Sequence, residues 1–160
     1  MTKNVYVSEA LVVPPRDDDR DFYRADLQFH GLDHSNASYE GRVFVNRPRV
    51  DASTPLDSSE GYAGSYFVFG HAGCWGDEGH CEIPKGPLTA YDLRPPHELE
   101  PQLAVLPVTD QVRALDNEAR KAVRITVLAV PAESAPPLTF ADVEDDVLRF
   151  ERLVLVTYDQ

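Results

Sequence analysis

The sequence is short of positive charge. It has 15 lysine and arginine residues against 27 aspartate and glutamate residues, a formal net charge of −12 at pH 7. Nucleic-acid backbones and anionic membranes would repel such a surface. The composition therefore argues against nucleic-acid and membrane partners, and it is compatible with a cation or a basic protein as ligand.

Long apolar runs are also missing. No stretch approaches the length of a membrane span, and the first 13 residues carry one lysine and no apolar core of secretory length. These absences predict a cytoplasmic protein, unless the chain is exported bound to another one. In the cytosol, thiols are kept reduced, which favours metal-bound or free cysteines over a disulfide.

Several motifs of known chemistry do not occur. The sequence has no glycine-rich phosphate loop, dinucleotide-binding fingerprint or Gly-x-Ser-x-Gly nucleophile motif. The only methionine is Met1, and the first histidine after Cys81 is His97. A blue-copper site needs a cysteine followed closely by histidine and usually methionine, so the sequence argues against an electron-carrying cupredoxin.

The apolar pattern that is present predicts strands. The segment from Tyr23 to Phe29 alternates, with Tyr23, Ala25, Leu27 and Phe29 expected to face the core. One short helix is expected after Thr109 as N-cap. Apolar, β-branched and aromatic runs predict strands at residues 5–13, 23–29, 41–46, 66–69, 103–108, 122–130 and 150–158. Together they predict an all-β protein, an antiparallel β-sandwich of about seven or eight strands with one short helix, in a single domain of residues 1–160.

The chemistry is concentrated between residues 61 and 84. This stretch holds both cysteines, the only tryptophan and two of the five histidines. It reads as a buried strand ending near Gly70, followed by a loop whose glycines allow a tight fold-back. His71, Cys74, His80 and Cys81 can therefore converge.

Three interpretations of this cluster remain open from the residues alone. Thiolate and imidazole ligands suit copper(I), or zinc as the alternative. A Cys74–Cys81 disulfide would instead close a short loop and contribute about 2–3 kcal/mol. The third interpretation is a pair of buried thiols with surface histidines. Against a four-ligand site, the His-x2-Cys-x5-His-Cys spacing is not that of a zinc finger, and adjacent His80 and Cys81 point to opposite sides of an extended chain.

A second histidine pair lies earlier in the chain. His30 and His34 flank a predicted turn, and Gly31 together with the preceding strand pattern argues against a helix that would place both on one face. We expect exposed turn histidines here, with a supplementary metal-binding role as the alternative.

The order of these segments is similar to that of a known domain. The most distinctive pieces are SYEGRVFVN, which includes residues 39–46, and AGSYFVFGH at residues 63–71, followed by YDLRPPHEL, VTDQVRAL and VRITVLAV. Over residues 27–158 the chain resembles the β-rich C-terminal domain of the tyrosinase and haemocyanin family of type 3 copper proteins.

The resemblance implies a role beside a copper enzyme. In the family, the dicopper centre belongs to a separate helical domain with six histidine ligands, whereas this chain has five histidines and no predicted helix long enough to carry such a site. The family's β-domain covers the entrance of the copper site and contributes to maturation or latency. We therefore expect an accessory domain that binds metal, copper in the first place, or caps or matures a type 3 copper partner or helical dicopper domain.

Two other functions remain open. One is a small copper-dependent oxidoreductase acting on phenols, in which His71 and His80, with His30 and His34, form an open copper site. The other is a structural domain that acts only through protein contacts.

Overall fold

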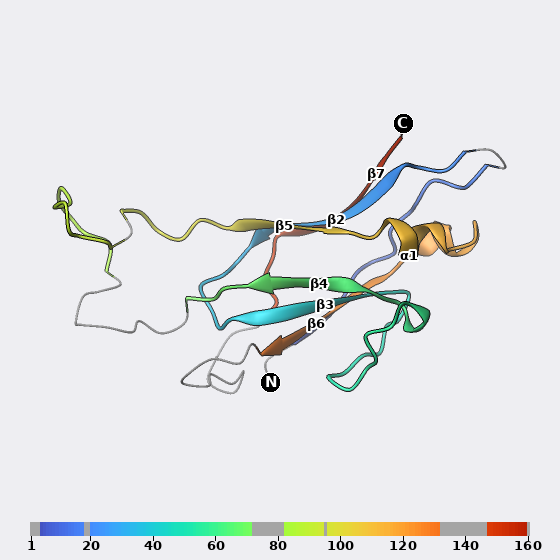
Figure 1. The fold of residues 1–160 in the computed structure, drawn as a ribbon, viewed down its shortest axis with the longest axis horizontal. Coiled ribbons are helices and arrows are strands. Elements are labelled where there is room, and N and C mark those ends of the chain that lie inside the picture. Colours follow the sequence, from blue (N-terminus) through green and yellow to red (C-terminus); the bar gives the residue numbers. More distant parts are fainter. Residues whose placement is uncertain (1–3, 18–19, 72–81, 95, 132–146, 160) are drawn as a thin grey trace.

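The computed structural model describes residues 4–17, 20–71, 82–94, 96–131 and 147–159. Two antiparallel sheets pack face to face, which confirms the predicted all-β sandwich (Figure 1). One sheet has the order β1 (Val5–Val7), β6 (Ile125–Pro131), β3 (Tyr39–Val45), β4 (Tyr62–Val68). The other has the order β5 (Gln102–Pro107), β2 (Arg24–Leu32), β7 (Arg152–Tyr158).

The central strand β2 shows how far alternation predicts burial. Ala25, Leu27 and Phe29 are fully buried, as expected from their period of two. Tyr23 is exposed instead, because the buried position before the strand is taken by Phe22. The expected outward-facing Asp26 is also buried, and it is paired with Arg24 at 2.7 Å.

Strand β4 lies at the edge of its sheet and is buried on one face only. Tyr66 and Val68 point into the core, whereas Phe67 and the following Phe69 are 76% and 77% exposed. The ring of Tyr66 lies over Gly41, where a Cβ would come within 2.5 Å of the ring. The glycine therefore makes room for the tyrosine. The predicted buried strand is in fact half-buried, because its side chains alternate between the core face and the outer face of the sheet.

The core is rich in aromatic contacts. The ring of Phe29 packs against Tyr66 at 4.5 Å and against Phe150 at 5.5 Å between centroids. The hydroxyl groups of Tyr39 and Tyr66 are buried, and neither has a hydrogen-bond partner with good geometry among the described residues. Burial raises the pKa of Tyr39 to about 12 and raises that of Tyr66 further. Both phenols therefore stay neutral.

The helix α1 (Thr109–Arg113) begins one residue earlier than expected. Val108 is its N-cap and makes no side-chain capping bond. The hydroxyl oxygen of Thr109 instead accepts a hydrogen bond from the backbone of Ala25 at 3.0 Å, which ties the helix to β2. Val112 is buried, as predicted, and Leu115 is partly buried. Two short 3-10 helices, η1 (Ser58–Glu60) and η2 (Ala119–Ala122), complete the described elements.

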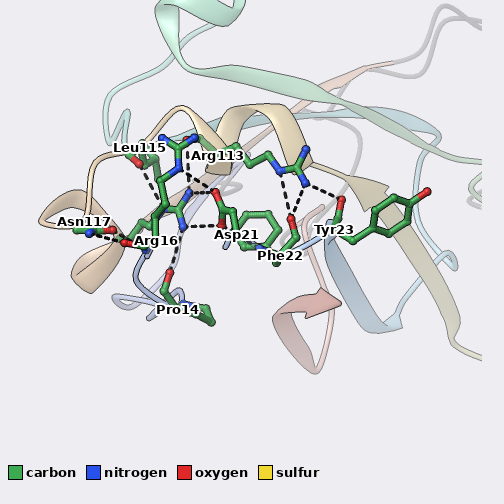
Figure 2. Close-up of polar contacts among 9 residues, drawn as sticks. Pro14, Arg16, Asp21, Phe22, Tyr23, Arg113, Leu115 and Asn117 are labelled. Carbon is green, nitrogen blue, oxygen red and sulfur yellow. Dashed lines mark hydrogen bonds and ion pairs between the residues drawn. The ribbon is translucent and has the colours of Figure 1, made fainter. Parts of the chain in front are cut away.

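One end of the sandwich is closed by a buried arginine, and we call the cluster of Arg120, Asp21, Phe22 and Arg113 the closed end (Figure 2). The guanidinium of Arg120 is fully buried and donates to both carboxylate oxygens of Asp21, at 2.8 and 2.7 Å. It also donates to the carbonyls of Pro14, Leu115 and Arg113 and lies over the ring of Phe22. All five N–H donors of Arg120 are thereby used.

The closed end joins segments that are far apart in the sequence. Arg113 donates to the carbonyl of Phe22 at 2.6 Å, so two arginines hold the chain that enters β2 (Figure 2). The hydrogen bond from Arg120 lowers the pKa of Asp21, and its charge adds to the effect. In the sequence, the charged run at residues 16–21 is typical of a solvated turn, and it ends in a carboxylate, Asp21, that the structure uses in the closed end. No helix among the described residues is long and apolar enough to span a membrane.

Candidate functional site

The opposite end of the sandwich carries the two histidines that the fold brings together, His34 and His71. We call His34, His71 and residues 82–94 the open end (Figure 1). His34 follows β2 and His71 follows β4, and the two strands lie in different sheets that end on the same side. Their rings contact each other edge to face, with centroids 4.9 Å apart.

His34 is a structural residue. It is 7% exposed, so the expectation of an exposed turn histidine is wrong at this position. Its Nε2 donates to the carbonyl of Glu100 at 2.9 Å, and its Nδ1 accepts from the side chain of Gln102 at 3.4 Å. Both ring nitrogens are therefore engaged, so neither is open to a metal ion.

His71 is held by His34 but keeps one nitrogen available. Its backbone N–H and its ring Nδ1 both donate to the carbonyl of His34, at 2.9 and 3.3 Å. The ring also contacts Phe69, with centroids 5.5 Å apart. The side chain is exposed, and Nε2 has no partner among the described residues. His71 can thus offer a single, oriented imidazole nitrogen to a ligand.

Gly70 explains why β4 approaches the loop after His34 so closely. A Cβ at this position would lie 1.9 Å from the carbonyl oxygen of Asn36. The backbone N–H of Gly70 also donates to the side chain of Ser38 at 2.9 Å. Any larger residue would push the two segments apart and would separate His71 from His34.

The remaining predicted ligands are only partly accounted for. Cys74, His80 and Cys81 lie outside the described residues, so the metal, disulfide and free-thiol interpretations all stay predictions. The part of the chain that is described contains no group of three or more histidine, cysteine or acidic side chains suited to a metal ion. His30 is half-buried on β2, where its Nε2 donates to the side chain of Gln28 at 3.0 Å.

A second feature of the open end is an arm formed by residues 82–94, which overlaps a proline-rich stretch at residues 84–101 that the sequence predicts to be an irregular surface loop of the kind that often faces a partner. In Figure 1 the arm projects beyond the ends of the strands. Its side chains Tyr91 and Leu93 are 94% and 91% exposed. The signal was present as large apolar residues in a proline-rich loop, but a sequence pattern does not show whether such residues fold back onto the core.

The arm is stiffened between its two apolar side chains. Arg94 forms a two-point ion pair with Asp92, at 2.9 and 2.6 Å. The backbone N–H of Asp92 donates to the carbonyl of Thr89 at 3.1 Å, which closes a turn. The hydrogen bonds from Arg94 lower the pKa of Asp92 to about 2, so the pair is charged at neutral pH. Tyr91 and Leu93 are thus presented by a locally ordered segment.

Comparison with known proteins supports the fold. No family model and no curated protein sequence matches the chain. Among solved structures, latent aurone synthase, a polyphenol oxidase from natural source, matches with a TM-score of 0.54 and 13% identity over 99% of this chain. Two structures of the recombinantly expressed latent enzyme match with TM-scores of 0.48 and 0.47, at 15% and 16% identity over 98% and 96% of this chain.

The match covers a limited part of the larger protein. This chain spans 24% of the length of the polyphenol oxidase, and the matching part is its C-terminal domain. At this identity the comparison shows a shared fold. It confirms the sandwich predicted from the likeness to the C-terminal domain of type 3 copper proteins.

Proposed function

We propose that this chain is an accessory domain that docks on a helical dicopper partner of the type 3 copper class and covers the entrance to its copper site. The observation that carries the proposal is the fold match over 99% of the chain to the C-terminal quarter of a polyphenol oxidase whose description calls it latent. The five histidines of the chain are one fewer than the six ligands of a dicopper centre, so the oxidation chemistry belongs to the partner.

The arm at the open end is suited to make the contact. Tyr91 and Leu93 are almost fully exposed, and burying a large apolar side chain contributes about 1.5–3 kcal/mol. The Asp92–Arg94 ion pair orders the backbone that carries Tyr91 and Leu93 before binding, which lowers the conformational entropy lost on docking. In this proposal Tyr91 and Leu93 are the anchors of the interface.

The test is inhibition of a copper-loaded helical dicopper domain from the same source by the purified chain. We expect phenol oxidation to fall as the chain is added, with saturation at one equivalent. The double variant Tyr91→Ser/Leu93→Ser should weaken inhibition at least about tenfold, equivalent to about 1.4 kcal/mol. Undiminished inhibition by this variant would reject the arm as the anchor, and no inhibition by the wild-type chain would reject capping.

Matched controls are available at the closed end. Val12 and Tyr23 are also strongly exposed apolar side chains, but they lie outside the open end. The variant Val12→Ser/Tyr23→Ser also replaces one exposed tyrosine and one exposed aliphatic side chain. It should inhibit like the wild type, which separates docking by the arm from general loss of surface hydrophobicity.

We further propose that the open end binds copper, with zinc as the alternative, during maturation of the partner. Support comes from the Nε2 of His71, which has no partner among the described residues and whose ring His34 orients, and from the proximity in sequence of Cys74, His80 and Cys81. Soft thiolate and imidazole donors favour copper(I). Such a site would hold the ion for transfer and would need no position for substrate.

Metal analysis with thiol counting tests this second proposal. Protein purified under reducing, metal-replete conditions should carry about one equivalent of copper or zinc, as for a thiolate–imidazole site. The variants His71→Ala, Cys74→Ala and Cys81→Ala should lose it. If the protein carries no metal, oxidised cysteines would indicate a disulfide, and freely titrating cysteines would indicate free thiols. Either result would reject the metal site. Oxygen consumption with a phenol by the isolated, copper-loaded chain would instead support the small oxidoreductase.

A further inference from the structure

The four edge strands of the sandwich differ in how well they are protected from pairing with another chain. β1 has only three residues, which is too short a template. β4 and β5 both lie beside register shifts, between Val43 and Phe44 and between Phe29 and Leu32. β4 also contains Gly64 at φ +130°, and β5 ends at Pro107. Such irregularities prevent a second strand from adding in register.

The fourth edge strand, β7, has none of these protections. It pairs with β2 over seven consecutive residues without a register shift. Its sequence RLVLVTY contains no proline, glycine, lysine or acidic residue. No described strand lies beyond it, and among the described residues outside β2 only Tyr23 makes a backbone hydrogen bond to it. A long, regular apolar edge of this kind is a template for strand addition.

We propose that the free edge of β7 pairs with β7 of a second copy of the chain, antiparallel and centred on Leu155, to form one continuous six-stranded sheet. The strand is complementary to itself in this register. On the outer face, Arg152 comes opposite Tyr158 of the second copy and Val154 opposite its Val156. On the core face, Leu155 meets its own counterpart and Leu153 meets Thr157. Within residues 152–158 no pair places like charges together, and one step beyond the strand Glu151 comes opposite Asp159.

Within the chain, Tyr158 already pairs with an arginine. On the other side of β7, Arg24 of β2 is the partner of Tyr158, and its guanidinium lies 6.0 Å from the centre of the tyrosine ring. An aromatic ring has two faces that attract a cation. Arg152 of a second copy would occupy the position relative to Tyr158 that corresponds to Arg24 on the far side of the strand.

Charge also favours this edge over the rest of the surface. Two copies that each carry a net charge of −12 repel one another. β7 contains one arginine and no acid, so repulsion between the facing strands themselves is absent. Because long-range repulsion is screened by salt, we expect the dimer to strengthen as ionic strength rises.

The test is a charge exchange measured by light scattering on a sizing column. The wild-type chain should shift from its monomer mass of 17.8 kDa to twice that mass as concentration rises. The variants Val154→Lys/Val156→Lys and Val154→Glu/Val156→Glu should each stay monomeric, because like charges would face each other twice. An equimolar mixture of the two should regain the dimer mass through two lysine–glutamate pairs. Leu153 and Leu155 remain in the core, so both variants should fold.

A matched control uses the other edge of the same sheet. Leu103 and Val105 on β5 are exposed apolar residues, and Leu103→Lys/Val105→Lys should leave the dimer unchanged. The proposal is overturned if the wild type stays monomeric up to about 0.5 mM, where a sub-millimolar dissociation constant is visible. It is also overturned if the dimer persists in both β7 variants or is lost in the β5 control. Dimerisation is measured without a copper partner, so its failure would leave the capping proposal standing.

Discussion

The two ends of the sandwich are held by different kinds of contact. At the closed end, Arg120 joins residues about a hundred positions away, and every N–H of its buried guanidinium is used. At the open end, the arm is ordered by an ion pair between residues two positions apart, and its apolar side chains face solvent. The closed end therefore stabilises the domain, whereas the open end leaves apolar surface free for a partner.

The difference follows from where the charges are paired. A buried charge is tolerated only when partners compensate its desolvation, so the Asp21–Arg120 pair is costly to disturb. The Asp92–Arg94 pair is exposed to water, and such pairs contribute little to the stability of the whole domain. Four predictions test whether stability and partner binding are divided between the two ends in this way.

The largest effect is expected for Arg120→Met. Removing one member of a buried ion pair leaves the other uncompensated, which lowers the free energy of unfolding by about 3–5 kcal/mol. Urea unfolding followed by circular dichroism measures this loss. The neighbouring Lys121→Met is the control, because Lys121 pairs with Glu118 at the surface and its loss should change stability by less than about 0.5 kcal/mol. Equal losses in the free energy of unfolding would contradict a dominant role of the buried Asp21–Arg120 pair.

Asp21→Asn removes the charge but keeps an amide oxygen that can accept from Arg120, so it should produce a smaller, pH-dependent loss of about 2–3 kcal/mol near neutral pH, the scale of a hydrogen bond to a charged group. The pKa of Asp21 is lowered in the folded state, so its contribution is complete above its unfolded pKa of about 3.9. The contribution disappears as pH falls through the lower, folded value. The gap in stability between wild type and variant should therefore be constant above about pH 5 and close in acid. If this stability gap widened as pH falls, the pKa of Asp21 could not be lowered in the folded state.

At the open end, His34→Ala should cost about 1–2 kcal/mol, because the buried imidazole and its hydrogen bond to the carbonyl of Glu100 are lost. His97→Ala is the matched control, since His97 is exposed and bonds only to the carbonyl of the adjacent Glu98 among the described residues. Thermal unfolding of the two variants gives the comparison. A loss as large as that of Arg120→Met would show that the open end is locked as firmly as the closed one.

The smallest effect on stability is expected for Tyr91→Ser/Leu93→Ser. These side chains make almost no contact with the domain, so the free energy of unfolding should stay within about 0.5 kcal/mol of wild type. The same variant is expected to lose docking to the copper partner. A drop in stability above about 1 kcal/mol would mean that the arm packs on the sandwich and is not free for a partner.

Much of the sandwich could be predicted from the sequence, because strand burial leaves a period of two. Ala25, Leu27 and Phe29 follow it, and the strongest strands were placed to within three residues of β6 and β7. The prediction was wrong where a side-chain hydrogen bond replaces the regular strand pairing. Residues 5–13 form only β1 and an isolated bridge at Leu11, because the chain around Ser8 bonds to the start of β6 through its side chain.

The closed end and the histidine pair could not be predicted in this way. Arg120 and Asp21 are 99 positions apart, and nothing in either local sequence marks the other as a partner. Likewise, His34 was expected at an exposed turn, but it is buried because the chain before β5 brings Glu100 and Gln102 against its ring. Long-range pairing of single polar residues carries no periodic signal. The cysteine-rich part of the candidate site stays a prediction.

The long-range hydrogen bonds of the closed end affect how fast the chain folds and unfolds. Asp21 and Arg120 can meet only after a loop of about a hundred residues has closed, and closing a long loop costs chain entropy before any contact forms. Sandwiches with such distant pairings fold in milliseconds to seconds. We expect mutation of Arg120 to accelerate unfolding more than it slows folding, because the lock forms after the sheets have met. The residue that stabilises the domain most would then act mainly on the lifetime of the native state.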